Sequence, residues 1–138
     1  MTFAAACVHA EGMIVGMGTD LVEIGRIRRS IELYGERFLN RIYTPLEQEY
    51  CAKRGVSAAE SFAARFAAKE AGMKALTTGM QKGVNWKDFE VTNEASGRPV
   101  LRLHGQAQAY ADRLRVRRIW ISLSHAIDHA IAVVVLED

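Results

Sequence analysis

The chain has 138 residues, of which 49% are hydrophobic and 25% are charged. This composition is typical of a soluble globular protein, and two cysteines, Cys7 and Cys51, are too few for a disulfide-rich scaffold. The net charge of +2 is too small to indicate a nucleic acid partner, and no apolar run approaches the roughly 20 residues that cross a membrane. We therefore expect a cytoplasmic protein with reduced thiols, and no nucleic acid or membrane partner.

The N-terminal residues 1–12 show no clear hydrophobic period. We expect them to form an extension that packs weakly or not at all, before a single domain over residues 13–138. Translation from Met13 is the alternative, because the patterned sequence begins directly after it.

The stretch from Met13 to Asp20 predicts a short buried strand, whose Gly16 and Gly18 allow close approach of another backbone. A dinucleotide-binding fingerprint is a weak interpretation, since Leu21 stands where its third glycine belongs. Asp20 at the strand end has two open interpretations: it holds a metal, or it caps the helix that follows.

Three helices are predicted next, over residues 21–34, 44–53 and 57–76. Gly35 ends the first of them. The second has Thr44 as N-cap and Pro45 at its first position. Ser57 and Glu60 form the capping box expected to open the third.

A glycine-flanked loop, from Gly79 to Gly83, follows the third helix. Beyond it the sequence predicts a hairpin over 86–92 and 98–103, a helix over 105–114, and a hairpin over 119–125 and 130–136, with Asp128 and His129 in its turn. The order strand, three helices, hairpin, helix, hairpin predicts an α+β fold with an antiparallel sheet. We expect the long third helix to lie across one face of that sheet.

Four charges stand among the alanines of the third helix: Arg65, Lys69, Glu70 and Lys74. The plain interpretation is a solvated face on which Glu70 and Lys74 form an i,i+4 pair, worth about 0.2–0.5 kcal/mol. The alternative is a site, because Asp20 and Glu70 are the kind of oxygen ligands that Mg²⁺ takes together with waters and substrate phosphates. The three basic residues would then neutralise a polyphosphate.

The dipeptide Ser124-His125 ends a predicted strand. It is not a nucleophile pair, because neighbours on a strand point to opposite faces. His125 and His129 have the spacing of a helical zinc pair, but they fall in a strand and a turn. His125 is therefore open to three roles: a phosphate ligand, a general acid or base, or a core histidine.

Three sequence blocks together resemble a known family. They are Gly-x-Gly-Thr-Asp-Leu-Val-Glu-Ile-x-Arg-Ile at 16–27, Arg-Phe-Ala-Ala-Lys-Glu-Ala-x-x-Lys-Ala at 65–75, and Ser-Leu-Ser-His at 122–125. In this order and at about this spacing, they resemble the holo-[acyl-carrier-protein] synthases, the short type of phosphopantetheinyl transferase. The resemblance covers roughly Met13 to Glu137.

The resemblance implies a magnesium-dependent transfer that supports fatty acid biosynthesis. Coenzyme A would give its 4′-phosphopantetheine group to a serine of apo acyl carrier protein, and adenosine 3′,5′-bisphosphate would be released. By this resemblance Asp20 and Glu70 bind Mg²⁺, which also binds the diphosphate of coenzyme A. Glu70, directly or through a water on the metal, deprotonates the serine.

The resemblance also assigns the contacts to coenzyme A. Lys74 stabilises charge on the diphosphate, and Arg65 and His125 contact phosphates. Ser124 and the loop from Gly79 to Gly83 help to seat the nucleotide.

The resemblance implies two protein partners. Four arginines, Arg26, Arg29, Arg37 and Arg41, would meet the acidic recognition helix of the carrier protein, where opposite charge speeds encounter and sets orientation. The family is typically a homotrimer with active sites between subunits. Two rival hypotheses remain: a non-catalytic module that keeps the fold, and a nucleic-acid-binding domain that uses its arginine clusters.

Overall fold

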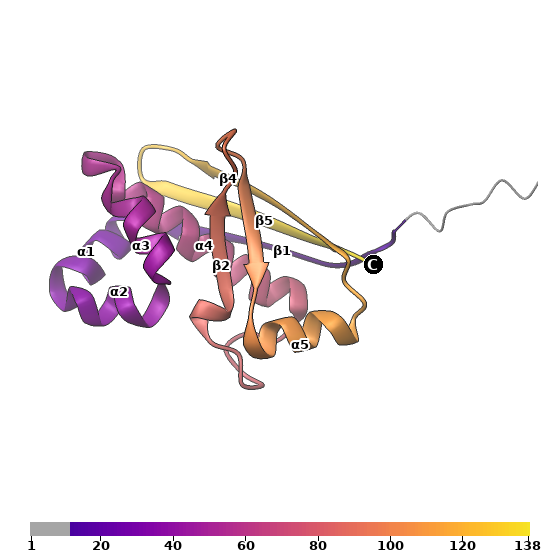
Figure 1. Cartoon of the computed structure of the whole chain (residues 1–138). Helices are drawn as coiled ribbons and strands as arrows, with labels where there is room; N and C mark the ends of the chain where they lie inside the picture. The colour runs from indigo at the N-terminus through magenta and orange to yellow at the C-terminus, as the bar shows by residue number, and fades with distance from the viewer. Residues whose placement is uncertain (1–11) are drawn as a thin grey trace, which may run out of the picture.

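The computed structural model describes residues 12–138, so the expected extension lies, apart from Gly12, outside the described residues. The helices are α1 (Ile24–Tyr34), α2 (Glu36–Ile42), α3 (Pro45–Ala52), α4 (Ala58–Leu76) and α5 (Gly105–Arg113). The strands are β1 (Ile14–Glu23), β2 (Phe89–Asn93), β3 (Pro99–Leu103), β4 (Arg118–His125) and β5 (His129–Glu137) (Figure 1). Among these residues no helix has the length and apolar character needed to cross a membrane.

The strands form two antiparallel sheets, one with the order β1-β5-β4 and one made of β2 and β3. The 19-residue helix α4 lies across one face of the three-stranded sheet (Figure 1). The predicted α+β fold, an antiparallel sheet packed against a long central helix, is confirmed.

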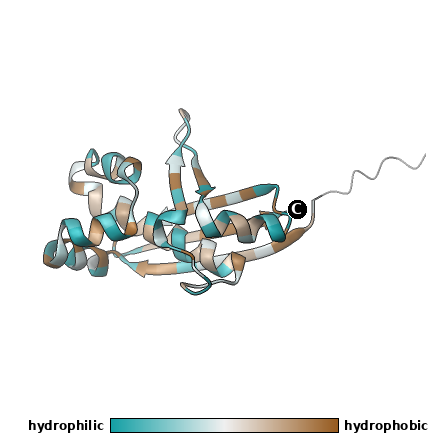
Figure 2. Ribbon diagram, turned by 60° about the horizontal axis from the view of Figure 1, so that its bottom comes forward, coloured by the Kyte–Doolittle hydropathy of each residue, from teal (hydrophilic) through white to brown (hydrophobic). Residues whose placement is uncertain are grey.

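The alternation of side chains along the strands explains how α4 is seated. The inner residues of β5 are fully buried: Ala130, Ala132, Val134 and Leu136. Gly16 and Gly18 of β1 lie against the carbonyl groups of Ala75 and Ala71, so a Cβ at either glycine would collide with the helix backbone. Hydrophobic residues recur along the strands (Figure 2), and the small residues of β1 and α4 let helix and sheet approach closely.

The opposite face of the same sheet, here called the outer face, carries large apolar side chains that are exposed to solvent. Met17 and Leu21 of β1 are 61% and 62% exposed, Trp120 of β4 is 43% exposed, and Ile131 of β5 is 40% exposed. The register aligns them in rows: Met17 and Trp120 both pair with Val135, and Leu21 pairs with Ile131. Within residues 12–138, this face has no helix over it.

The first strand is longer than predicted. β1 continues to Glu23 and α1 begins at Ile24, so Asp20 lies inside the strand. The interpretation of Asp20 as a helix cap is therefore wrong, since Glu23 occupies the N-cap position. The physical reason is the continued pairing with β5, in which Leu21 and Val22 face Ile131 and Ala130.

Other boundaries also differ from the prediction. The predicted N-cap at Thr44 is confirmed, and Glu47 completes a capping box with it. Ser57 makes no side-chain cap bond, because the 3-10 turn before α4 places it in a different backbone conformation. Glu36–Ile42 forms the additional helix α2. His129 belongs to β5 rather than to the turn, and Trp86–Asp88 is a 3-10 turn ahead of β2.

Candidate active site

Two carboxylates meet where β1 passes α4. Asp20 shares the inner face of β1 with Gly18, and Glu70 projects from α4 toward it. Lys74 Nζ lies 3.1 Å from Asp20 Oδ1 and donates to the carbonyl of Thr19 at 3.0 Å. The ion pair of Lys74 is thus with Asp20 on the sheet, and the plain interpretation of a Glu70–Lys74 surface pair does not hold.

Burial and the adjacent Asp20 carboxylate raise the pKa of Glu70, while Arg26 and Lys74 oppose this shift. A half-buried carboxylate with a raised pKa is suited to accept a proton. Two carboxylates this close also favour a bound cation, which relieves their mutual repulsion. No third metal-ligating side chain joins them within residues 12–138, so the protein would supply two ligands.

An apolar cavity of about 170 Å³ opens beside Glu70. We call it the loop hollow; its lining residues are Glu70, Met73, Lys74, Gly79, Met80 and Trp86. Gly79 belongs to the predicted glycine-flanked loop and has a φ of 55°, a conformation that favours glycine. Gly83 lies apart from this cavity, next to Gln106 of α5.

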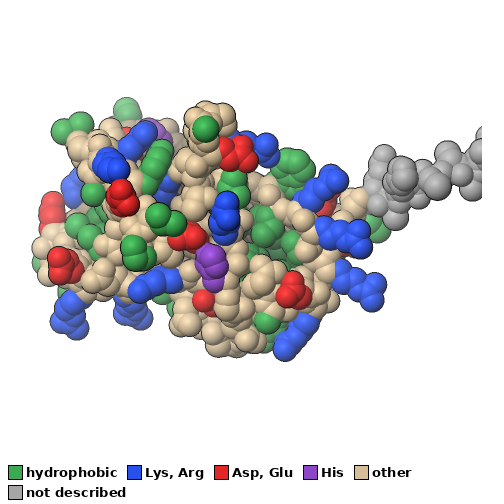
Figure 3. All heavy atoms as spheres, in the orientation of Figure 1, with side chains coloured by type: hydrophobic (Ala, Val, Ile, Leu, Met, Phe, Trp, Pro, Cys, Tyr) green, Lys and Arg blue, Asp and Glu red, His purple; other side chains and the backbone are tan. Residues whose placement is uncertain are grey.

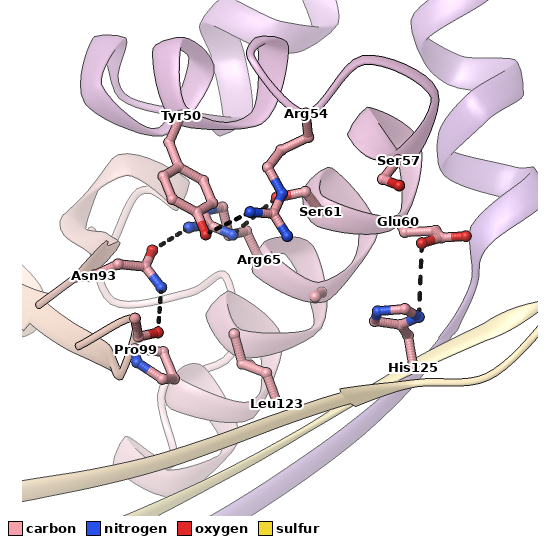
Figure 4. Close-up of a pocket in the computed structure, with 12 residues that line it drawn as sticks. Tyr50, Arg54, Ser57, Glu60, Ser61, Arg65, Asn93, Pro99, Leu123 and His125 are labelled. Atoms are coloured by element: carbon pink, nitrogen blue, oxygen red, sulfur yellow. Dashed lines mark hydrogen bonds and ion pairs between the residues drawn. The ribbon is translucent and has the colours of Figure 1, made fainter. Parts of the chain in front are cut away.

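A second cavity, of about 330 Å³, lies at the other end of α4 (Figure 4). We call it the arginine pocket. It is lined by Tyr50, Arg54, Ser57, Glu60, Ser61, Ala64, Arg65, Asn93, Gly97, Pro99, Leu123 and His125. Its walls therefore come from α3, α4, the β2–β3 hairpin and the end of β4.

Arg65 is the fixed centre of this pocket. Its side chain is 3% exposed, donates to Asn93 Oδ1 at 2.6 Å and to Ser61 Oγ at 3.1 Å, and lies 4.2 Å from the centroid of the Tyr50 ring. Among the described residues its Nε has no hydrogen-bond partner. A buried guanidinium with only neutral hydrogen-bond partners and a spare donor is a strong attractor for an anion.

His125 completes the pocket from β4. Its Nδ1 lies 3.7 Å from Glu60 Oε2, and the ring points into the cavity (Figure 4). Arg54 stands nearby and donates to the hydroxyl of Tyr50 at 3.4 Å. Sequence reasoning missed Arg54, Asn93 and Glu60 as pocket residues; each comes from a separate element, and no local motif marks them.

Two predicted ligand contacts, Lys69 to a polyphosphate and Ser124 to the nucleotide, lie outside both cavities. Lys69 is completely buried and paired with Glu47 at 2.7 Å, so the expectation that it neutralises a polyphosphate is wrong. Ser124 is exposed and pairs with Ile131 on the outer face, whereas Leu123 and His125 face α4. This is the alternation that a strand imposes on neighbouring side chains.

The carboxylate pair and the arginine pocket lie at opposite edges of the three-stranded sheet. Asp20 is on β1 and His125 is on β4, and β5 separates the two strands. One chain therefore carries two separate sites, one rich in carboxylates and one rich in positive charge.

The four predicted partner arginines are exposed on α1 and α2. Arg37 and Arg41 line a third cavity, of about 380 Å³, together with Ser30, Tyr34 and Phe38. Arg29 lies 3.7 Å from Glu23, and Arg26 stacks over the Phe66 ring at 5.8 Å, close to the carboxylate pair. On the face drawn in Figure 3, Lys and Arg side chains stand at both ends of the molecule.

Comparison with known sequences defines the class of protein. Residues 16–134 match the family model of the 4′-phosphopantetheinyl transferase superfamily, so the chain belongs to this superfamily. Within it, the chain is 54% identical to the holo-[acyl-carrier-protein] synthase of Koribacter versatilis (strain Ellin345) over 91% of this chain and 100% of that relative. It is 53% identical to that of Solibacter usitatus (strain Ellin6076), with the same coverage. The resemblance inferred from the three sequence blocks is confirmed.

Solved structures agree in fold. The holo-[acyl-carrier-protein] synthase of Neisseria meningitidis superposes with a TM-score of 0.83 at 33% identity, covering 91% of this chain and 100% of that one. The enzyme of Bacillus anthracis, solved in complex with CoA (3′,5′-ADP), gives a TM-score of 0.75 at 36% identity, covering 91% and 97%. The Helicobacter pylori enzyme, solved in complex with coenzyme A, gives 0.76 at 31% identity, covering 87% and 98%.

Proposed function

We propose that this chain is a holo-[acyl-carrier-protein] synthase of a single domain over residues 13–138. It transfers the 4′-phosphopantetheine group of coenzyme A to a serine of apo acyl carrier protein and releases adenosine 3′,5′-bisphosphate, in support of fatty acid biosynthesis. The observation that carries the proposal is the pairing of Asp20 and Glu70 on a chain that also has a preformed anion pocket around Arg65.

The proposed reaction is a displacement at the phosphorus that bears the pantetheine. The serine oxygen bonds to this phosphorus, and the bond from phosphorus to the bridging diphosphate oxygen breaks. The serine proton goes to Glu70, whose raised pKa suits it to accept a proton. Such transfers depend mainly on positioning and charge neutralisation, which Lys74 and Arg26 supply beside the carboxylates.

The cofactor proposed for this site is Mg²⁺, held by Asp20 and Glu70. The donor set fits, because Mg²⁺ is commonly bound through one or two carboxylates while substrate phosphates and waters complete its coordination. When bound, the ion would neutralise charge on the diphosphate.

Coenzyme A has two ends of different chemistry, and the arginine pocket and the loop hollow match them. We assign the phosphates of the nucleotide to the arginine pocket, with Arg65 and His125 as ligands. The loop hollow, which is mostly apolar and adjoins Glu70, suits the pantetheine side. Ser124 and Gly83 remain proposed contacts to the nucleotide, although they lie outside both cavities of a single chain.

The proposed assembly is a homotrimer. Its support is the apolar outer face, where Met17, Leu21, Trp120 and Ile131 are exposed. The placement of the two sites at opposite edges of the sheet is a second argument, since one coenzyme A would then be held between the carboxylate pair of one copy and the arginine pocket of the next.

The carrier protein is proposed to bind α1 and α2. Arg26, Arg29, Arg37 and Arg41 offer positive charge, and the cavity beside Tyr34 and Phe38 offers an apolar contact between two of these arginines. The proposal includes a cytoplasmic location, which the free, buried thiol of Cys51 supports.

The decisive experiment is intact-protein mass spectrometry of an apo acyl carrier protein incubated with this chain and coenzyme A. We expect a mass gain of one phosphopantetheine group that requires Mg²⁺. Binding of coenzyme A without any mass gain on several carrier proteins would instead favour a non-catalytic module.

A further inference from the structure

A buried ion pair lies next to the candidate site and has no role in the chemistry proposed above. Lys69, the residue before Glu70, has its Nζ 2.7 Å from Glu47 Oε1, and both side chains are 0% exposed. Burying two charges is costly, and well-packed apolar residues are often at least as stable in their place. Stability alone therefore does not account for the pair, and its bonds indicate what else it does.

The pair joins three elements. Lys69 Nζ donates to the carbonyls of Trp86, at 3.3 Å, and Phe89, at 2.5 Å. Glu47 Oε2 accepts from the amide of Val91 at 3.0 Å, and Glu47 also closes the capping box of α3. The middle of α4 is thereby tied to the start of α3 and to the segment that enters β2.

Trp86 is the link to the active site. Its ring stacks on Phe66 with the centroids 4.9 Å apart, and it lines the loop hollow together with Glu70 and Lys74. The connection that carries Gly79 and Met80 leaves α4 at Thr77 and ends at Trp86. Lys69 thus holds the end of the connection whose Gly79 and Met80 line the cavity.

We propose that Lys69 and Glu47 are positioning residues for the transfer reaction. Their ion pair holds Trp86 and the loop before it, so that the loop hollow keeps the shape that accepts the pantetheine side of coenzyme A. This inference rests on the proposed function. It assigns to the pair its main effect on the pantetheine end, and only a smaller effect on the arginine pocket, to which α3 and β2 also contribute walls.

The main test compares two double variants. Glu47→Gln/Lys69→Met removes both buried charges with little change of size, and Glu49→Gln/Lys53→Met removes the exposed pair on α3, whose atoms are 3.0 Å apart. We expect the first variant to raise KM for coenzyme A about 10- to 100-fold, a typical cost of a displaced binding wall. The Kd for adenosine 3′,5′-bisphosphate, which lacks the pantetheine arm, should change by less than about twofold, and the control should match the unmodified chain in both.

Two results would overturn the inference. An unchanged KM for coenzyme A in the folded double variant would mean that the pair is only structural. A parallel rise in KM and in the Kd for the bisphosphate would mean general loosening of the protein. If the unmodified chain transfers nothing, the proposed function fails instead, and a readout that needs no turnover still tests the pair.

That readout is the fluorescence of Trp86. The chain has two tryptophans, so Trp120→Phe leaves Trp86 alone. In this background Glu47→Gln/Lys69→Met should make Trp86 clearly more accessible to acrylamide, and unchanged quenching would contradict the inference.

If the double variant does not fold, Trp86→Leu removes the wall and keeps the ion pair. It should raise KM for coenzyme A with the Kd for the bisphosphate unchanged, and equal changes in both would again reject the positioning role.

Discussion

Two sites beside α4, called here its arginine end and its carboxylate end, carry opposite chemistry, although Arg65 and Glu70 both lie in the middle turns of the helix. Toward its start, the Arg65 guanidinium is buried and held by the neutral partners Ser61 and Asn93, so the pocket keeps a surplus of positive charge. Toward its end, Glu70 adjoins Asp20, and the Lys74 side chain beside them is 56% exposed. A phosphate is attracted to the first site directly but requires a cation at the second. This contrast supports the proposed division, with the nucleotide bound at Arg65 and the chemical step at Glu70.

The largest effect on transfer is expected from substitutions that remove a negative charge at the carboxylate end. Glu70→Gln and Asp20→Asn should each lower kcat by about 10³-fold, because a proton acceptor or a ligand of the charge-stabilising cation is lost. The Kd for adenosine 3′,5′-bisphosphate should stay within about twofold, since the arginine pocket is intact. Transfer is measured by mass spectrometry and binding by calorimetry, with Asp112→Asn as a surface control. Near-normal turnover of either variant at saturating Mg²⁺ would refute the metal assignment.

The second prediction tests whether the two ends must come from different copies. Ile131→Lys places a charge on the outer face and should convert the proposed trimer to monomers, with transfer reduced about 10²-fold because the carboxylate pair of one copy would no longer adjoin the arginine pocket of the next. Ile127→Lys is the matched control, since this isoleucine is 98% exposed in the turn between β4 and β5. Sedimentation and light scattering give the mass of each variant. A monomeric Ile131→Lys variant with full activity would show that one chain holds the complete site.

The third prediction is the converse of the first: binding of the nucleotide should weaken while kcat is largely retained. Arg65→Met should weaken binding of adenosine 3′,5′-bisphosphate by about 10- to 100-fold, as expected when a charged hydrogen-bonding group is lost. At saturating coenzyme A, kcat should remain within about threefold of the original value. Arg102→Met, at an exposed position on β3, serves as control. If kcat falls as steeply as it does for Glu70→Gln, the two ends of α4 do not divide the work as proposed.

The sequence predicted the elements of the fold well, because hydrophobic period and turn residues mark them locally. It also predicted that Asp20, Glu70 and Lys74 belong together, through the resemblance of their blocks. What it missed depends on partners far along the chain. The end of β1 is set by pairing with β5, and no local signal at Leu21 shows this.

The charges of α4 illustrate the same limit. Lys69 and Lys74 look equivalent among alanines, yet one is buried and the other is exposed. The difference arises from Glu47, which lies 22 residues before Lys69 and has no visible relation to it in the sequence. The arginine pocket was likewise only half predicted, because Asn93 and Arg54 reach it from separate elements.

The smallest expected effect concerns the carrier protein, which should approach the carboxylate end from α1 and α2. Arg37→Glu reverses one exposed charge beside the Tyr34 and Phe38 cavity and should raise KM for the carrier protein about fivefold at low salt. The effect should shrink at high salt, because exposed charges are screened. Steady-state kinetics with coenzyme A and carrier protein varied in turn separate the two substrates, and Arg102→Glu is the control for charge reversal elsewhere. Equal increases in KM for both substrates would place Arg37 outside the carrier interface. The docking surface would then be provided by Arg29 and Arg26, and Arg26 already adjoins Phe66 and the carboxylates.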